Sequence, residues 1–213
     1  MGVRILLADD HTLVRQGLRR MLEERREWRV VAEACDGREA IMLAQLHRPD
    51  VAIIDVAMPM LNGVETTRQL LRRVPRVKVL VLSMHVDEVY VGQILKAGAA
   101  GYLLKDSADI DLFKAVAAVA DGQSFFSPAI AKLMVDEYAR PRLEGQDRYE
   151  TLSAREREVF QLIAEARTNK EIASLLGISP TTVESHRANI IYKLDLHSAA
   201  QIALYAVRRG VIR

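Results

Sequence analysis

The sequence predicts an α/β fold, a doubly wound five-stranded parallel sheet, followed by a small all-α helix-turn-helix domain. Two observations predict it. The first 121 of the 213 residues alternate short apolar runs with helical patterns, and the pattern from Thr151 onward is wholly helical. The apolar runs are continuous rather than alternating, which is typical of parallel strands covered on both faces. Strict alternation of strand and helix is the order that builds an open sheet between two helical layers.

The first domain is expected to contain five strands and five helices. The strands are expected at 4–8, 29–34, 51–54, 78–82 and 101–104. The helices are expected at 11–25, 37–47, 63–73, 87–97 and 108–120. Sheets of this kind bind ligands beyond the carboxyl ends of their strands, where the strand order switches. This rule places the expected site before any motif is considered.

The region after the sheet is expected to connect two domains. Gly122 breaks the pattern, a short helix is expected from Pro128 to Tyr138, and the polar run 139–150 indicates a linker. The predicted division is 1–121 for the sheet domain, 122–150 for the short helix and linker, and 151–213 for the helical domain.

Four helix starts mark the second domain. Capping boxes, in which side chains close the free N–H groups of a first helical turn, begin at Ser153, Thr168 and Ser198. Ser179 followed by Pro180 adds an N-cap with proline at the first helical position. Helices are therefore expected to begin near 154, 169, 180 and 199.

Composition excludes several classes of protein. Half the residues are hydrophobic and 27% are charged, yet no apolar run reaches the roughly 18 residues of a membrane span. The acidic pair at 9–10 interrupts the N-terminal apolar run before a signal peptide could form, so we expect a cytoplasmic protein without membrane contact. Residues 1–127 carry no net charge and 128–213 carry +2, so charge alone does not indicate nucleic acid. Cys35 is the only cysteine, which excludes an intrachain disulfide, and we expect it to be a small buried apolar residue in a strand or at its end.

Three carboxylates are expected to converge at the carboxyl edge of the sheet. Asp9 and Asp10 end the first strand and Asp55 ends the third. Two such charges about 4 Å apart repel by roughly 4 kcal/mol at an effective dielectric near 20, so the cluster needs a cation. An all-oxygen site with spare positions suits Mg²⁺ holding a phosphate. Lys105 after the fifth strand and Ser83 at the end of the fourth add a positive charge and a hydroxyl, both able to bind phosphoryl oxygens.

A simpler interpretation is that Asp9 or Asp10 only caps a helix. The coincidence of acidic, hydroxyl and basic side chains at four strand ends argues against it. These residues also resemble a known family: Leu7–His11, Asp55–Gly63, Leu82–Met84 and Gly101–Lys105 look like the signature segments of receiver domains. The resemblance covers about residues 1–121 and implies a flavodoxin-like receiver fold.

The receiver resemblance implies a phosphorylation site. Asp55 would accept a phosphoryl group from a sensor histidine kinase. Asp10, Asp55 and the backbone carbonyl of Ala57 would hold Mg²⁺, with Asp9 acting partly through water. The remaining implied roles are phosphate pairing by Lys105, a phosphate hydrogen bond from Ser83, and a switch formed by Ser83 and Tyr102. An alternative for Tyr102 is packing at the strand end with its hydroxyl in water.

The second domain contains a helix, a tight turn and a second helix. Gly177 supplies the left-handed conformation that such a turn often needs. On the second helix Val183, Ile190 and Leu194 share a buried face. The opposite face is polar and low in bulk, and could enter a major groove. From this pattern alone, a plain amphipathic helix in a small bundle is an equally good interpretation.

The segments 152–159, 168–173, 182–190 and 193–194 closely resemble the LuxR-type helix-turn-helix, so the whole chain looks like a response regulator of the NarL/FixJ type. That resemblance implies base contacts from Glu184, Ser185 and Ala188. The implied phosphate contacts come from Thr182, Arg187 and Lys193, with Asn169 and Lys170 at the start of the preceding helix. Ala166 stands where relatives usually have glycine, at the end of the domain's first helix.

We therefore expect a transcription regulator whose DNA binding depends on phosphorylation, and not a conventional enzyme. Its expected partners are a sensor histidine kinase, double-stranded DNA with paired half-sites and a second copy of the phosphorylated chain, with RNA polymerase a further candidate. An alternative is a DNA-binding regulator whose receiver is only a dimerisation scaffold. A nucleotide-dependent enzyme is excluded because the first turn lacks a glycine-rich phosphate loop. A phosphatase of the same architecture would want a different aspartate spacing.

Overall fold

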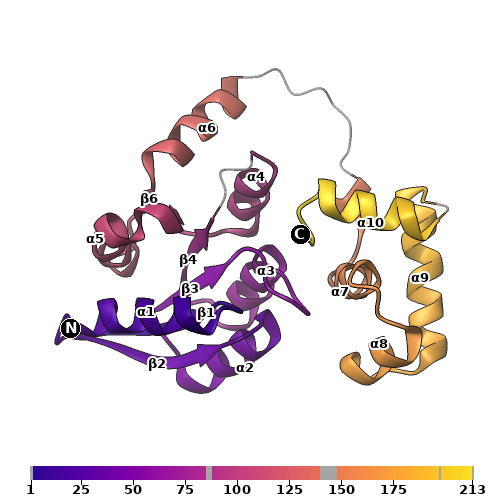
Figure 1. Ribbon diagram of the computed structural model, residues 1–213, viewed down its shortest axis with the longest axis horizontal. Helices are drawn as coiled ribbons and strands as arrows, with labels where there is room; N and C mark the ends of the chain where they lie inside the picture. The colour runs from indigo at the N-terminus through magenta and orange to yellow at the C-terminus, as the bar shows by residue number, and fades with distance from the viewer. Residues whose placement is uncertain (1, 85–87, 140–147, 197, 213) are drawn as a thin grey trace. The chain divides into compact units, whose positions relative to one another are not determined.

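The chain folds into two compact units, Met1–Arg140 and Pro141–Arg213. The computed structural model describes residues 2–84, 88–139, 148–196 and 198–212 (Figure 1). Most of the predicted linker, 139–150, lies outside the described residues. No described helix is long and apolar enough to cross a membrane.

The first unit is a parallel sheet in the order β2-β1-β3-β4-β5-β6. The five predicted strands are all present, and a sixth strand of two residues pairs with β5. The prediction of five strands missed β6 because two residues are too few to show a hydrophobic period. The strands are β1 Val3–Ala8, β2 Trp28–Ala34, β3 Val51–Asp55, β4 Lys78–Ser83, β5 Gly101–Leu104 and β6 Phe125–Phe126.

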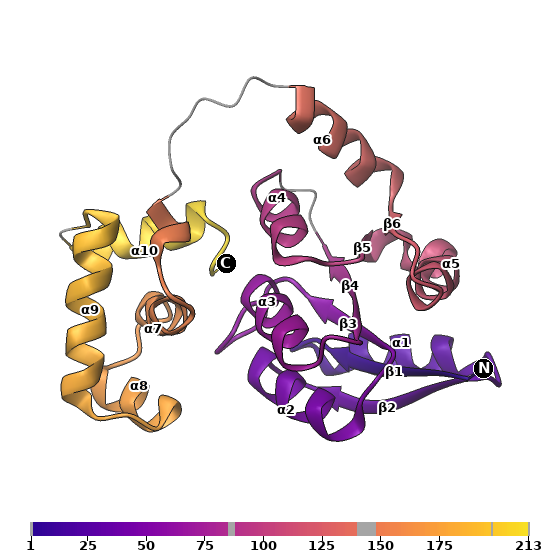
Figure 2. The ribbon, with the colours of Figure 1, turned by 180° about the vertical axis from the view of Figure 1, so that it is seen from behind.

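Helices cover both faces of this sheet, as Figure 1 and Figure 2 show from opposite sides. One core cluster lies between the sheet and α1 and α5, and the other lies between the sheet and α2, α3 and α4. Alternate residues of β1 enter each cluster, which is why the strand is apolar at nearly every position. The helices are α1 Thr12–Glu23, α2 Gly37–His47, α3 Gly63–Arg73, α4 Glu88–Ala97, α5 Ala108–Ala120 and α6 Pro128–Ala139, with a 3₁₀ turn η1 at Lys105–Ser107.

Helix α6 belongs to the first unit. The sequence placed it in a separate connecting segment, but Ile130 is fully buried and Leu133 packs against the cluster that α4 shares. The burial of one apolar face therefore extends the first unit beyond residue 121. The unit then ends near residue 140.

Cys35 is exposed, so the expectation of a buried residue was wrong. It lies one position past Ala34, the last paired residue of β2, where the chain has already left the sheet. Its N–H donates to Glu39, and a hydrogen bond between this carboxylate and the thiol raises the pKa of Cys35. A raised thiol pKa means less thiolate and a less reactive cysteine.

The second unit is wholly helical over its described residues. Full capping boxes start α7 and α8, while Ser179 and Ser198 accept the N-cap hydrogen bonds of α9 and α10. The predicted helix starts are all confirmed. The elements are a 3₁₀ turn η2 Arg148–Thr151, α7 Ala154–Ala164, α8 Asn169–Leu176, α9 Pro180–Leu194 and α10 Ala199–Arg208.

Three features shape the second unit. Gly177 adopts a left-handed conformation with φ of 63°, as the predicted tight turn requires. Val183, Ile190 and Leu194 are buried, which leaves the opposite face of α9 free of the core. Phe160 of α7 packs edge-on against an aromatic ring from η2 and another from α10, so a single residue ties three elements together.

Candidate functional site

The predicted acidic cluster is present at the carboxyl ends of the strands. Asp9 follows β1, Asp55 is the last residue of β3, and both are 2–3% exposed. Lys105 begins η1, directly after β5, and its Nζ lies 2.6 Å from Asp9 Oδ2 and 2.9 Å from Asp55 Oδ1. One ammonium therefore joins two buried carboxylates that come from the switch point of the sheet.

The electrostatic balance of this cluster keeps Lys105 charged. Burial by itself lowers the pKa of the ammonium. The negative charge of Asp55 and the hydrogen bonds to Asp9 and Asp55 outweigh burial, so the pKa of Lys105 lies above its usual value. The cluster thus holds a permanent cation beside the carboxylate that sequence analysis identified as the phosphoryl acceptor.

Asp10 and His11 extend the cluster toward solvent. The Asp10 side chain is 29% exposed, and its Oδ1 lies 2.8 Å from His11 Nδ1. The His11 N–H donates to Asp9 Oδ1 at 2.8 Å, the local turn that aspartate commonly makes two residues on. Ligand atoms of Asp9, Asp10 and His11 lie within 4.8 Å of one another. An oxygen-rich donor set of this kind is what Mg²⁺ prefers.

Arg15 is a contributor that the sequence analysis missed. Its NH1 donates to the backbone carbonyl of Asp9 at 2.6 Å, and its Nε lies 3.7 Å from Glu33 of β2. The guanidinium therefore ties α1 to the end of β1 and helps to fix the backbone that carries the acidic pair. Only its place one turn into α1 could have indicated this role.

Ser83 and Tyr102 lie on the two strands beside β3. Ser83 ends β4 one position beyond Leu82, the register partner of Asp55, and it is buried. Tyr102 of β5 is fully buried in the cluster under α2, α3 and α4. The alternative in which its hydroxyl stays in water is therefore wrong for this structure. Ala57, two residues beyond Asp55, is half-buried beside these strand ends.

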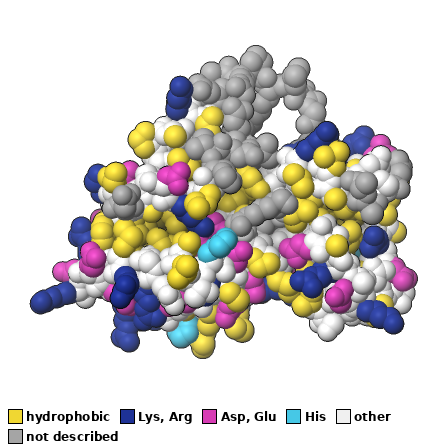
Figure 3. All heavy atoms as spheres, in the orientation of Figure 1, with side chains coloured by type: hydrophobic (Ala, Val, Ile, Leu, Met, Phe, Trp, Pro, Cys, Tyr) yellow, Lys and Arg dark blue, Asp and Glu magenta, His cyan; other side chains and the backbone are white. Residues whose placement is uncertain are grey.

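The second candidate site is the exposed face of α9. Thr182, Glu184, Ser185 and Ala188 are all exposed on it, and Lys170 is exposed at the start of α8. Figure 3 shows acidic and basic side chains interspersed on the face that it displays, in keeping with the net charge of +2. Of the four α9 residues named above, Glu184 alone is charged, so contact with DNA would depend on individual side chains.

Arg187 and Asn169 are in contact with each other. The Arg187 NH1 donates to Asn169 Oδ1 at 3.3 Å, which links α9 to the start of α8. Two residues expected at phosphates thus form one polar group on neighbouring helices. Tyr192 lies one turn beyond Ala188, on the face that the sequence predicts could enter a major groove, and it is 87% exposed.

Lys193 is held within the second unit. Its Nζ lies 2.7 Å from Glu156 Oε2 and donates to the Thr151 carbonyl at 3.3 Å. Glu156 also accepts from the Ser153 N–H, closing the capping box of α7. Burial raises the pKa of Glu156, but the hydrogen bonds from Lys193 and Ser153 outweigh it and leave the pKa below its usual value. A DNA phosphate would have to share Lys193 with this carboxylate.

Two families match the chain. Residues 5–117 match the response regulator receiver domain, and residues 150–206 match the bacterial regulatory proteins of the luxR family. The transcriptional regulatory protein DegU of Brevibacillus brevis is 38% identical over an alignment of 227 residues including gaps, and the alignment covers 99% of this chain and 95% of that protein.

Solved structures are similar over nearly the whole length. The response regulator ChrA of a heme-sensing two-component system is 33% identical over 99% of both chains, with a TM-score of 0.55. RcsB of Salmonella enterica serovar Typhimurium, bound to promoter rprA in the presence of the phosphomimetic BeF₃⁻, is 27% identical. That match covers 96% of this chain and 98% of the RcsB chain, with a TM-score of 0.61.

Proposed function

The chain belongs to the response regulators that join a receiver domain to a LuxR-type DNA-binding domain, and we propose that Asp55 is its phosphoryl acceptor. The protein is a phosphorylation-dependent transcription regulator and not a conventional enzyme. One observation carries the assignment of Asp55: the Lys105 ammonium lies 2.6 Å from Asp9 and 2.9 Å from Asp55 in a buried cluster at the strand ends. A buried carboxylate beside a fixed cation is suited to accept a phosphoryl group, because the cation offsets the added negative charge.

The chemistry of the proposed step is transfer between two side chains. An Asp55 carboxylate oxygen forms a bond to phosphorus as the bond between phosphorus and the kinase histidine breaks. Lys105 then pairs with a phosphoryl oxygen, and the Ser83 hydroxyl donates to another. Movement of Ser83 toward the phosphate would change the packing around Tyr102, which is already fully buried in this structure. The buried position of Tyr102 supports a role in packing against the moving strand end.

The donor set at the strand ends fits Mg²⁺. Asp10, Asp55 and the backbone carbonyl of Ala57 would hold the ion, with Asp9 beside them, and the ion would supply positive charge to the phosphoryl oxygens. The convergence of the Asp9 and Asp10 oxygens supports this assignment. His11 lies within the same group and would have to leave these oxygens as the ion binds.

We assign DNA contact to the exposed face of α9. Glu184, Ser185 and Ala188 would face base edges, and Glu184 can accept a hydrogen bond from cytosine. Two of these three side chains are small, so DNA shape would contribute to recognition. Phosphate contacts would come from Asn169, Lys170, Thr182, Arg187 and Lys193, the last shared with Glu156.

The finer partners are also proposals. A sensor histidine kinase supplies the phosphoryl group, and the phosphorylated chain forms a homodimer that binds paired half-sites in double-stranded DNA. Leu204 and Val207 on α10 are each 50% exposed, which supports pairing through that helix. Pairing of two weak DNA-binding heads can raise avidity by about 10²–10⁴-fold. RNA polymerase is the further partner, and the site of action is the cytoplasm, where the DNA is.

The test compares DNA binding with and without a phosphate donor. Acetyl phosphate or beryllofluoride with Mg²⁺ should strengthen binding to an operator selected from random DNA, as measured by fluorescence anisotropy. Asp55→Ala should abolish the increase, whereas the matched control Asp121→Asn, an exposed carboxylate after α5, should keep it. An Asp55→Ala variant that still responds would overturn the assignment. Strong binding that never responds to the donor would favour the alternative of a receiver that acts only as a scaffold.

A further inference from the structure

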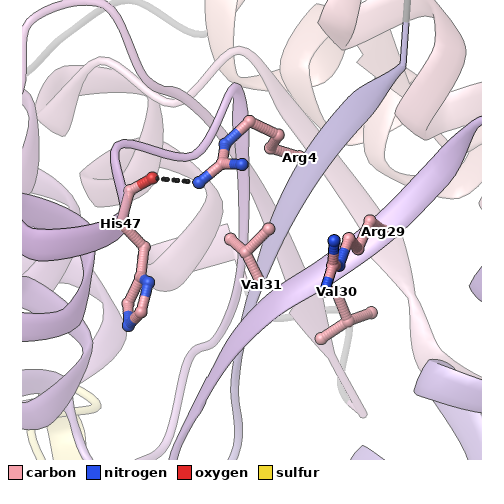
Figure 4. Close-up of a pocket in the computed structure, with 5 residues that line it drawn as sticks. All are labelled: Arg4, Arg29, Val30, Val31 and His47. Atoms are coloured by element: carbon pink, nitrogen blue, oxygen red, sulfur yellow. Dashed lines mark hydrogen bonds between the residues drawn. The ribbon is translucent and has the colours of Figure 1, made fainter.

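A cavity of about 310 Å³ lies at the amino ends of the receiver strands, whereas the proposed phosphorylation site lies at their carboxyl ends. It is formed at the start of β1 and β2 and the end of α2, and it is lined by Arg4, Arg29, Val30, Val31 and His47 (Figure 4). Nothing in the proposed function uses these residues. Pockets for small molecules begin at about 300 Å³, so the space suits a small metabolite.

Two like charges lie on neighbouring strands at this cavity. Arg4 and Arg29 are register partners in the parallel pairing of β1 and β2. Neighbouring strands lie about 4.8 Å apart, and like charges opposite one another are unfavourable. The arrangement therefore costs stability unless something negative lies between or beside the two guanidinium groups.

Arg4 is partly neutralised by the protein itself. Its NH2 donates to the His47 carbonyl at 2.7 Å, at the carboxyl end of α2 where the helix dipole is negative. Its backbone N–H donates to Asp50 Oδ2 at 2.8 Å, so that carboxylate is also engaged at this edge. Figure 4 shows the Arg4 side chain turned to His47, with Val31 between Arg4 and Arg29.

Arg29 has no such compensation. It is exposed, and among the described residues its guanidinium forms no hydrogen bond or ion pair. His47 is half-buried, and within the part of the chain that the structure describes its imidazole forms no hydrogen bond or ion pair, because the bond from Arg4 is accepted by the His47 backbone carbonyl. A free guanidinium and a free imidazole thus line one cavity together with two apolar side chains.

The backbone at this cavity is irregular. The register between β1 and β2 shifts after the Ile5–Val30 pair, which leaves Val31 as an extra residue on β2. β2 is the edge strand of the sheet. Bulges concentrate at edges and redirect side chains, and this one lies inside the cavity wall. Val30 is buried in the core cluster under α1 and α5, so Val31, which is partly exposed, offers the apolar surface next to the charged side chains.

From these observations we infer that this cavity binds a small dianion that carries a phosphate or carboxylate group on a short carbon skeleton. Arg29 offers a planar fork that matches two oxygens of such a group. His47 adds a second donor, and Val31 contacts the carbon atoms. The site is independent of Asp55, since it lies at the opposite ends of the strands.

The test is a titration of the full-length protein followed by ¹H–¹⁵N NMR in Mg²⁺-free buffer at fixed ionic strength. Inorganic phosphate and succinate are the two probes. The amides of Arg29, Val30, Val31 and His47 should shift and saturate together. Arg29→Gln should weaken the binding at least tenfold, while Arg76→Gln, which removes another exposed arginine of the same unit, should leave it unchanged.

The two probes separate the kinds of ligand. Saturation by phosphate alone supports a phosphorylated ligand, saturation by succinate alone supports a carboxylate, and saturation by both supports the wider class of dianions. Shifts that rise without saturation would overturn the inference, because they indicate screening of surface charge only. Equal weakening by the Arg29 and Arg76 variants, or none by Arg29→Gln, would also overturn it.

Discussion

Ala166→Gly should stabilise the DNA-binding unit. Ala166 follows α7 with φ of 59°, and Gly177 follows α8 with φ of 63°. In both turns the N–H of the next residue donates to the carbonyl oxygen five residues before it, at 3.0 Å. The two helix ends therefore have the same geometry and differ in carrying alanine or glycine at the left-handed position.

The size of the effect follows from two opposing terms. The left-handed conformation costs a residue with a Cβ roughly 1–2 kcal/mol. Glycine also makes the unfolded chain more flexible, which destabilises the folded state by about 0.4–1 kcal/mol and is subtracted from that gain. The net gain for Ala166→Gly is about 0.5–1 kcal/mol. In a unit of this size it would raise the melting temperature by about 3–6 °C.

The reverse substitution is a matched control. A Cβ added to Gly177 meets no atom within 4 Å, so Gly177→Ala should lose about the same 0.5–1 kcal/mol through conformation alone. The assay is unfolding of the full chain in urea, monitored by hydrogen exchange of the amides in α7 and α9. Tryptophan fluorescence would not serve, because Trp28, the sole tryptophan, reports on the first unit. The double variant should be close to wild type. If both single variants shift stability in the same direction, the conformational explanation is wrong.

Three further predictions concern the two sites. Lys105→Met removes the cation that offsets the added phosphoryl charge, so acetyl phosphate should phosphorylate Asp55 less and operator binding should no longer rise; a normal rise in anisotropy would contradict the role of the ammonium. Glu156→Gln should cost about 1 kcal/mol at pH 7. Folding lowers the pKa of Glu156, so the contribution of this carboxylate to stability is complete above its ordinary pKa of about 4.3 and is lost as the pH falls through its pKa in the folded protein. The urea midpoints of the wild-type protein and the variant should therefore converge at that low pH. A difference between the midpoints that stays constant with pH would refute the ion pair. Glu184→Ala should reduce the discrimination between bases at one position of the DNA site by about 1–3 kcal/mol, as measured by selection from random DNA. Lys170→Ala should weaken binding to all DNA sequences alike and reduce the slope of log affinity against log salt concentration by about one, as measured by salt titration.

The strands and helices could be predicted because their signals are local. Each parallel strand is a short continuous apolar run, and each helix of the second unit begins at a residue that caps it. The strand β6 escaped prediction because it is defined by pairing with β5 rather than by its own pattern. Cys35 was misjudged because exposure changes abruptly at the residue after a strand ends.

The candidate sites were predictable to different degrees. Strand order places Asp9 and Asp55 at the carboxyl ends of the neighbouring strands β1 and β3, and the long side chain of Lys105 reaches both from the end of β5, which is separated from β3 by β4. On α9 the helical period places residues on a face, but it says nothing of what each side chain contacts. Lys193 illustrates the limit, because its partner Glu156 lies 37 residues away on another helix.

The sequence by itself determined which segments form strands and helices, where the helices begin, and that acidic side chains meet at one edge of the sheet. These features depend on periods, caps and strand direction, all of which are properties of neighbouring residues. Only the tertiary structure decided that Arg15 holds the Asp9 carbonyl, that Lys193 is bound to Glu156, and that Arg29 lines a cavity. Long side chains reach several ångströms in many directions, so their partners depend on which elements pack beside them.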